Sequence, residues 1–183
     1  MKELSLNILD ITENSVKAGA ALTEILLDET EAELSVTIRD NGCGMTEEVL
    51  KGVTDPFYTT RTTRNVGLGL PLLKMAAEQT GGYMTVESKH KDKFPENCGT
   101  TVKAVFNKNH IDYTPLGDII STLVTIIQGH PDTDFYFLHK KNEKCVELDT
   151  RQLRDILEDV PLNSYEVLSW VGGYLREEYD QLC

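Results

Sequence analysis

The sequence is short of positive charge and lacks any long apolar run. It contains 18 Lys and Arg against 30 Asp and Glu, which gives a formal net charge of −12 at pH 7. Such a chain repels the nucleic-acid backbone and anionic lipid, so we expect neither as a partner. No segment approaches the roughly 18 consecutive apolar residues of a membrane-spanning helix. We therefore expect a cytoplasmic protein.

The sequence also lacks paired cysteines. Cys43, Cys98, Cys145 and Cys183 are far apart, and no two of them have the CxxC spacing of a zinc site. Their separation favours no disulfide framework either, so we expect reduced thiols. With 183 residues and 40% hydrophobic content, the chain is long enough for one ordinary domain and a small second unit.

Hydrophobic periodicity divides the first 107 residues into helices and strands. The segment 54–66 is different, because it is polar, rich in threonine and without an apolar period. A polar segment of this length is typical of a functional loop, and we expect it to form a lid. The predicted helices span residues 3–18, 46–53 and 70–79, and the predicted strands span residues 22–27, 34–40, 83–88 and 100–106.

A second set of elements begins after about Asn107. This half is acidic, with 7 Lys and Arg against 14 Asp and Glu. The expected helices are 116–128, 151–159 and 164–179, and the expected strands are 134–139 and 145–148. The pattern therefore predicts a first domain over residues 1–107 and a small α+β extension over residues 108–183, which we interpret as a regulatory or interaction module.

Asp40 is the first candidate for a binding residue. It falls on the same face of its predicted strand as Leu34 and Ile38, where an unpaired carboxylate is costly. The turn that follows, Asn41 to Gly44, contains two glycines that permit a close backbone approach. A carboxylate beside such a turn could accept from the amino group of adenine, or it could satisfy local amides in an Asx-type turn. The residues alone leave both readings open.

Asp10 and Asn14 are spaced four residues apart on the first predicted helix, so they share one face, with Lys17 nearby. Asn14 could offer its amide oxygen to Mg²⁺, a hard cation that takes few protein ligands beside phosphates and water. Asp10 could then orient or deprotonate an attacking group. The alternative is an ordinary solvated helix edge.

The run Gly67-Leu68-Gly69-Leu70 precedes a predicted helix. Free backbone amides and the positive end of the helix dipole make such a position suitable for an anion. Arg61 and Arg64 lie just upstream and could place a guanidinium on terminal phosphates. Thr59 and Thr60 could contact phosphate or simply form a turn.

Four separated motifs occur in a characteristic order. They are Asp10 to Ala18 (DITENSVKA), Asp40 to Met45 (DNGCGM), Asp55 to Leu73 (DPFYTTRTTRNVGLGLPLL) and Gly99-Thr100-Thr101. These segments resemble the N, G1, F with G2, and last boxes of the GHKL ATPase superfamily, and they are most similar to histidine-kinase catalytic domains. The resemblance covers roughly residues 4–107.

The resemblance implies a Bergerat-type two-layer α/β sandwich with a mixed sheet and a site for ATP and Mg²⁺. Asn14 would be the Mg²⁺ ligand, and Asp40 would accept from adenine with help from Thr100 through water. Phe57 would anchor the lid. The other nucleotide contacts implied are Lys17, Gly42, Gly44, Met45, Thr59, Thr60, Arg61, Gly67, Leu68, Gly69 and Leu70.

The catalytic residues that the resemblance implies are Asp10, Arg61 and Arg64. Asp10 stands where the family often has Glu, and its shorter side chain predicts slow hydrolysis. Since the chain begins at the first box, we expect the phosphoacceptor on a separate protein. The expected function is phosphate transfer from ATP to a partner, with a slow ATPase or a non-hydrolysing ATP-dependent switch as alternatives. The oligomeric state is open.

Overall fold

Residues 3–55 and 68–182 are described by the computed structural model of the chain. The helices are α1 (Leu4–Lys17), α2 (Glu47–Gly52), α3 (Gly69–Gln79), α4 (Ile119–Gly129), α5 (Thr150–Leu157) and α6 (Tyr165–Leu182). The strands are β1 (Leu22–Glu29), β2 (Glu33–Asp40), β3 (Tyr83–Lys89), β4 (Gly99–Asn107), β5 (Asp134–Lys141) and β6 (Lys144–Asp149). The predictions for Phe57, Thr59, Thr60, Arg61, Arg64 and Gly67 lie outside the described residues.

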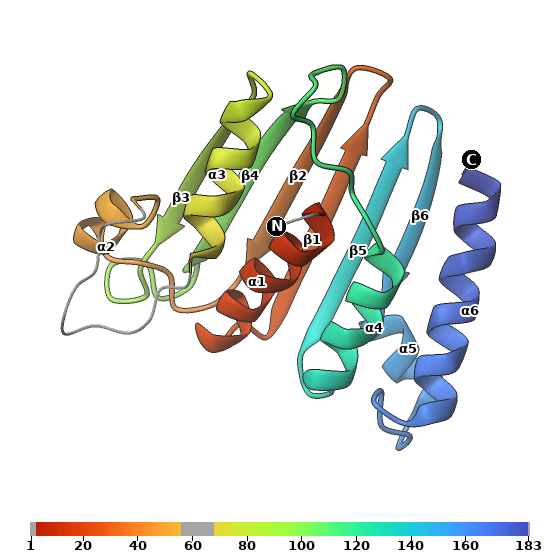
Figure 1. The fold of residues 1–183 in the computed structure, drawn as a ribbon. Coiled ribbons are helices and arrows are strands. Elements are labelled where there is room, and N and C mark those ends of the chain that lie inside the picture. The colour runs from red at the N-terminus through yellow and green to blue at the C-terminus, as the bar shows by residue number, and fades with distance from the viewer. Residues whose placement is uncertain (1–2, 56–67, 183) are drawn as a thin grey trace.

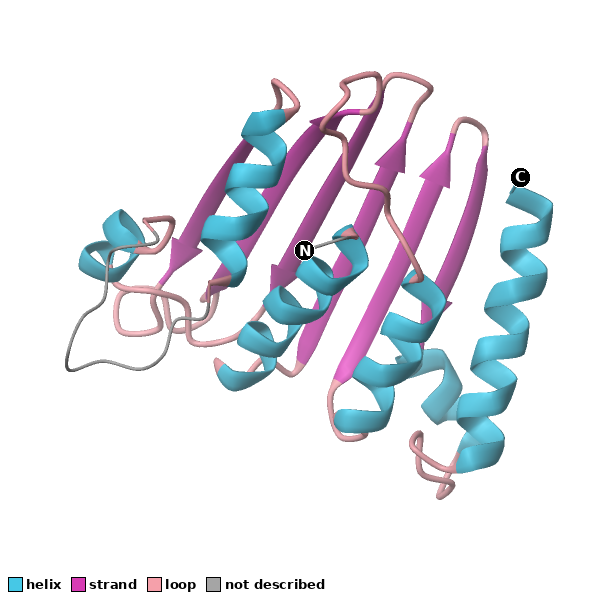
Figure 2. Cartoon of the chain, viewed as in Figure 1, coloured by secondary structure: helices cyan, strands magenta, loops and turns pink. Residues whose placement is uncertain are grey.

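The strands form one six-stranded sheet in the order β3-β4-β2-β1-β5-β6 (Figure 1). β1 and β5 run parallel, and the other four neighbouring pairs are antiparallel. The sheet is therefore mixed. Helices α1, α3 and α4 lie side by side over one of its faces (Figure 2). The expected two-layer α/β sandwich with a mixed sheet is confirmed.

Side-chain alternation explains why these strands pair in this way. In β1, β2 and β5 every second residue is buried and the residues between them are more exposed. The buried side chains, such as Ile25, Ile38 and Phe137, join Ile8 of α1 in a single apolar core. Because side chains alternate between the faces of a strand, this pattern gives a sheet with one covered face.

The C-terminal half continues the same sheet. β5 pairs with β1 over eight residues, from Leu22 opposite Asp134 to Glu29 opposite Lys141. Helix α4 packs beside α1, and α6 packs on α4 and β6. Both halves contribute strands to one sheet and side chains to one core. The expected division at Asn107 into an ATP-binding domain and an interaction module therefore stays a prediction about what each half does.

A buried polar cluster also joins the two halves. The His139 ring on β5 lies 2.9 Å from Glu29 Oε2 on β1 and 2.8 Å from the Tyr179 hydroxyl on α6. Lys108 donates to the other oxygen of Glu29 at 2.6 Å. Burial lowers the pKa of His139 below its ordinary value, although the Glu29 carboxylate opposes this shift. Burial works against the charge on Glu29, but Lys108 outweighs it and keeps the pKa of that carboxyl low.

The start of α4 and the end of α6 each differ by three residues from the prediction, and the start of α4 has a clear local cause. The sequence predicts this helix from residue 116, whereas it begins at Ile119. Gly117 adopts a left-handed φ of 78°, and the Asp118 side chain caps the helix by accepting from Ser121 N at 2.9 Å. Among the described residues, no helix is long and apolar enough to cross a membrane.

Candidate nucleotide-binding site

The Asp40 carboxylate lies at the end of β2 and is half-buried. Ser15 Oγ of α1 donates to its Oδ2 at 2.8 Å. The backbone N–H groups of Gly42 and Thr100 donate to Oδ1 at 2.9 and 3.3 Å. The Gly42 bond makes the local Asx-type turn, so this reading of the sequence holds. A carboxylate has about four acceptor positions, and three are used by these donors, which leaves capacity for a ligand donor.

Asn41 fixes the turn after Asp40 to the start of β1. Its Oδ1 accepts from Ala21 N at 2.8 Å and from Leu22 N at 2.9 Å. Cys43 N also donates to the Ala18 carbonyl at 2.9 Å. Sequence reasoning missed this role of Asn41, although an Asn beside glycine in a turn is a recognisable signal for side-chain bonding to backbone amides.

The two glycines of the turn are required by the protein's own backbone. A Cβ at Gly42 would lie 2.9 Å from the Ala18 Cβ. Gly44 has a left-handed φ of 67°, and a Cβ there would collide with the Lys89 carbonyl. The close backbone approach that the glycines were expected to permit is therefore to the α1–β1 connection and to the end of β3.

Ser88 of β3 organises the neighbourhood of Thr100. Its hydroxyl accepts from Met45 N at 2.7 Å and lies 2.8 Å from Thr100 Oγ1 and 3.1 Å from the Gly99 carbonyl. The Met45 side chain is half-buried against the core. Thr100 therefore contacts Asp40 through its backbone and Ser88 through its hydroxyl. Sequence reasoning missed Ser88, because nothing local marks its partners.

Helix α1 brings the first motif to this end of the sheet. Asp10 is exposed, Asn14 is half-buried, and Lys17 is exposed in the last turn. Gly69 at the start of α3 packs against Asp10, since a Cβ there would lie 3.1 Å from the Asp10 Cβ. The first motif and the glycine motif therefore meet directly.

The two leucines of the glycine motif have different surroundings. Leu68 is 60% exposed, whereas Leu70 is buried in the core at 5%. Leu70 thus anchors the first turn of α3 while Leu68 remains open to solvent. The start of α3, the C-terminal half of α1, the end of β2 and the start of β4 lie at the same end of the sheet (Figure 1).

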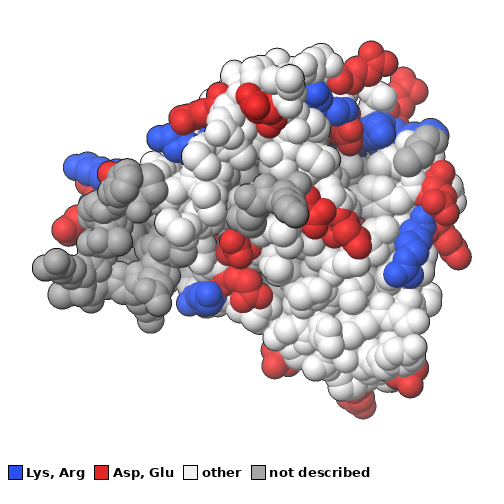
Figure 3. All heavy atoms as spheres, viewed as in Figure 1, with Lys and Arg blue, Asp and Glu red and all other residues white. Residues whose placement is uncertain are grey.

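Among the described residues, Lys17 in the last turn of α1 is the cation that the sequence predicts to contact the nucleotide. Acidic and basic side chains are interspersed over the upper part of the face in Figure 3. The described residues contain no group of three or more His, Cys, Asp or Glu that could hold a metal ion. A Mg²⁺ ion at this position would have to be held mainly by phosphates and water, and the half-buried Asn14 could offer it one amide oxygen.

The fold and the convergent motifs define a GHKL-type nucleotide-binding domain, and comparison with known proteins agrees. The model of the histidine kinase-, DNA gyrase B- and HSP90-like ATPase family matches residues 2–110. The chain therefore belongs to this family, whose domains bind ATP. The sensor protein SrrB of Staphylococcus aureus is 35% identical over 94 residues, which cover 49% of this chain and 16% of SrrB.

Two solved structures share the fold at low sequence identity. The Aquifex aeolicus MutL ATPase domain complexed with ADP has a TM-score of 0.56 and 11% identity, and the match covers 86% of this chain and 70% of that one. The N-terminal domain of a DNA repair protein has a TM-score of 0.56 and 17% identity, covering 81% of this chain and 53% of that one. Both matches cover more of the chain than the family model does, so the likeness in fold extends into the C-terminal half.

Proposed function

We propose that this chain binds Mg-ATP at the end of β2 and transfers the γ-phosphoryl group to a separate partner protein. The observation that supports this best is the Asp40 carboxylate, which Ser15, Gly42 and Thr100 hold in place and which keeps acceptor capacity for one more donor. An exocyclic amino group of adenine has the required chemistry.

In this proposal each motif has one task. Asn14 is the protein ligand of Mg²⁺, and Gly69 with its neighbours offers backbone amides to the phosphates. Bound Mg²⁺ would neutralise the charge on the phosphates. Arg61 or Arg64 would approach the terminal phosphate as a cation.

Transfer itself requires an acceptor and a base. A nucleophile on the partner attacks the γ-phosphorus, the bond between this phosphorus and the β–γ bridging oxygen breaks, and ADP leaves. Asp10 would take the proton that the nucleophile loses. Its position beside Gly69 at the start of α3 supports this role.

A partner is proposed because SrrB is named a sensor protein. The chain spans about one sixth of the length of the curated relatives that it matches, so this comparison concerns the ATPase domain alone. The C-terminal half, with exposed Trp170 stacked on Tyr174 at 5.2 Å, is proposed as the interaction module.

A slow ATPase or a non-hydrolysing switch is the second candidate. Asp10 favours it, because an aspartate reaches less far than the glutamate often found at that position in the family. The sheet shared by the two halves also favours it, since nucleotide binding at the end of β2 acts on the same sheet as β5 and β6.

Titration calorimetry of ATP and ADP with and without Mg²⁺, followed by a phosphate-release assay, tests the proposal. We expect micromolar ATP binding that strengthens with Mg²⁺, and release that is lost in Asp10→Asn while binding remains. Binding without release or transfer would favour the switch. Absence of binding would refute the nucleotide site.

A further inference from the structure

A histidine from outside the family match contacts helix α1 next to the proposed Mg²⁺ ligand. The His130 Nε2 atom lies 2.7 Å from Glu13 Oε1. His130 follows the last residue of α4, and its backbone N–H donates to the Ile126 carbonyl at 3.1 Å. Glu13 precedes Asn14 and lies nearly one turn after Asp10. The two contacting side chains are largely shielded, at 22% and 34% exposure.

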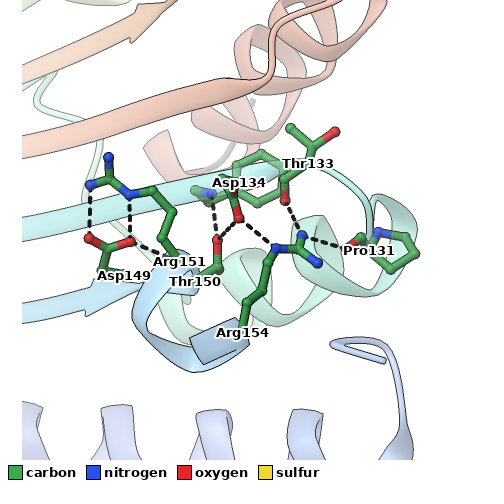
Figure 4. Close-up of polar contacts among 8 residues, drawn as sticks. Pro131, Thr133, Asp134, Asp149, Thr150, Arg151 and Arg154 are labelled. Carbon is green, nitrogen blue, oxygen red and sulfur yellow. Dashed lines mark hydrogen bonds and ion pairs between the residues drawn. The ribbon is translucent and has the colours of Figure 1, made fainter. Parts of the chain in front are cut away.

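The segment that carries His130 is braced by α5 (Figure 4). Arg154 donates to the Pro131 carbonyl at 2.6 Å, to the Thr133 carbonyl at 3.2 Å and to the Asp134 carboxylate at 2.7 Å. Thr150 Oγ donates to the same carboxylate at 3.0 Å and accepts from Phe135 N at 2.8 Å. These contacts limit the freedom of the loop between α4 and β5, so His130 is presented from a fixed position.

The start of β5, which follows this loop, is linked to the turn after Asp40 through Ala21. Asp134 N donates to the Ala21 carbonyl at 3.0 Å, and Ala21 N donates to Asn41 Oδ1 at 2.8 Å. The start of β1 is thereby held between the nucleotide turn on one side and β5 on the other. The C-terminal half therefore contacts the first nucleotide motif directly at Glu13, and it is linked to the second only through Ala21.

The contact between His130 and Glu13 constrains rotation of α1 about its axis. At 3.6 residues per turn, Glu13 and Asn14 project about 100° apart, so Glu13 can contact α4 while Asn14 points elsewhere. A rotation of about 10° would move a side-chain atom at a radius of ~6 Å by about 1 Å. Displacements of about 1 Å are known to reduce catalysis by roughly a hundredfold, and Mg²⁺ requires near-ideal ligand geometry.

We propose that His130 is a positioning residue for the nucleotide site, which acts through Glu13 to hold Asn14 and Asp10 in their working orientation. The inference rests on the proposed function and deepens it, because it gives the C-terminal half a direct effect on Mg-linked ATP binding. Asp40 is held separately by Ser15, Gly42 and Thr100, so adenine recognition should not depend on His130.

The full chain provides the test, with ATP affinity measured by calorimetry in Mg²⁺ and in EDTA. For His130→Ala we expect Mg²⁺ to strengthen ATP binding about tenfold less than in the wild type, while affinity in EDTA is unchanged. His130→Gln places an amide donor near the position of Nε2 and should restore most of the Mg²⁺ effect. His110→Ala is the matched control. His110 lies in the loop after β4, whereas Thr100 of the nucleotide site lies at the start of that strand.

The possible outcomes separate the inference from the proposed function. A wild-type chain that binds no ATP would refute the nucleotide site and with it the role of His130. If the wild type binds and His130→Ala keeps the full Mg²⁺ effect, the positioning role is wrong. Equal losses in Mg²⁺ and in EDTA, without recovery in His130→Gln, would indicate a general structural role and also overturn it. Circular dichroism and a melting curve of each variant accompany the titrations.

Discussion

Asp40 has donors on both oxygens, and its replacement by Asn would remove the charge and turn one acceptor into a donor. We expect Asp40→Asn to weaken ATP binding by roughly ten- to a hundredfold, the range for a lost hydrogen bond to a charged group. Asp28→Asn, on an exposed position of β1, is the control and should bind ATP normally. Calorimetry on variants with unchanged circular dichroism measures the effect. Near-normal affinity in Asp40→Asn would contradict the assignment.

His139 predicts a pH dependence of stability. Burial, the largest influence, lowers its pKa in the folded chain below the ordinary value of 6.5. The unfolded chain keeps the ordinary pKa of about 6.5, whereas the folded chain has a lower one. At a pH between the two, the unfolded chain binds a proton that the folded chain does not, so the free energy of unfolding falls as the pH drops below about 6.5. One group contributes a slope of at most about 1.4 kcal/mol per pH unit.

Urea unfolding between pH 7.5 and 5.5 measures this slope. His139→Gln should be less stable at pH 7.5 and show a flatter dependence on pH than the wild type. The interval lies above the ordinary pKa of 4.5 for Glu29, so titration of its carboxylate should contribute little. An unchanged slope in His139→Gln would assign the acid sensitivity to other groups.

The candidate residues that the sequence alone can single out are those whose side chains bind or react by themselves. Asp40 and Asn14 stand out by residue type and spacing. Ser15, Asn41 and Ser88 do not, because their partners are distant in sequence: Ser15 donates to Asp40, 25 residues away, and Ser88 accepts from Met45, 43 residues away. A serine on an apolar helix stripe gives no local sign of such a partner.

Among the elements, the connection after α1 and the turn after β2 depend on their glycines to different degrees. Gly44 and Gly19 both have left-handed φ values, of 67° and 77°. An added Cβ meets nothing within 4 Å at Gly19 but collides with the Lys89 backbone at Gly44. We expect Gly19→Ala to cost about 1–2 kcal/mol from backbone strain alone, and Gly44→Ala to cost clearly more and to weaken ATP binding. Denaturant unfolding of both variants compares them, and equal losses would show that the turn relaxes freely.

Local signals were sufficient for the elements but not for their pairing. The alternation of apolar residues in β2 and the apolar stripe of α1 are patterns of near neighbours in the sequence. The bounds of these two elements were therefore predicted to within one residue at each end. The parallel pairing of β1 with β5 joins Leu22 to Asp134, and no period in the sequence encodes that neighbour. The sequence could therefore not predict that strands from residues 1–107 and from residues 108–183 join one sheet.

At the scale of the whole molecule, the shared sheet predicts that residues 1–110 do not fold stably alone, although they include all four nucleotide motifs. Their isolation would leave the backbone groups of β1 unpaired along the edge now occupied by β5. It would also remove Phe135, Phe137, Leu123 and Ile126 from the common core. Loss of so much apolar contact exceeds what a domain of marginal stability tolerates.

We therefore expect the fragment to aggregate or to unfold without a cooperative transition, and to bind ATP more weakly than the full chain. Size-exclusion chromatography, urea unfolding and calorimetry on both proteins measure this. Supplying residues 111–183 as a separate chain should restore part of the affinity, because β5 could then pair with β1 again. A monomeric fragment with cooperative unfolding and full ATP affinity would instead make residues 108–183 a separable domain, and would remove the structural basis for any influence of that half on the nucleotide site.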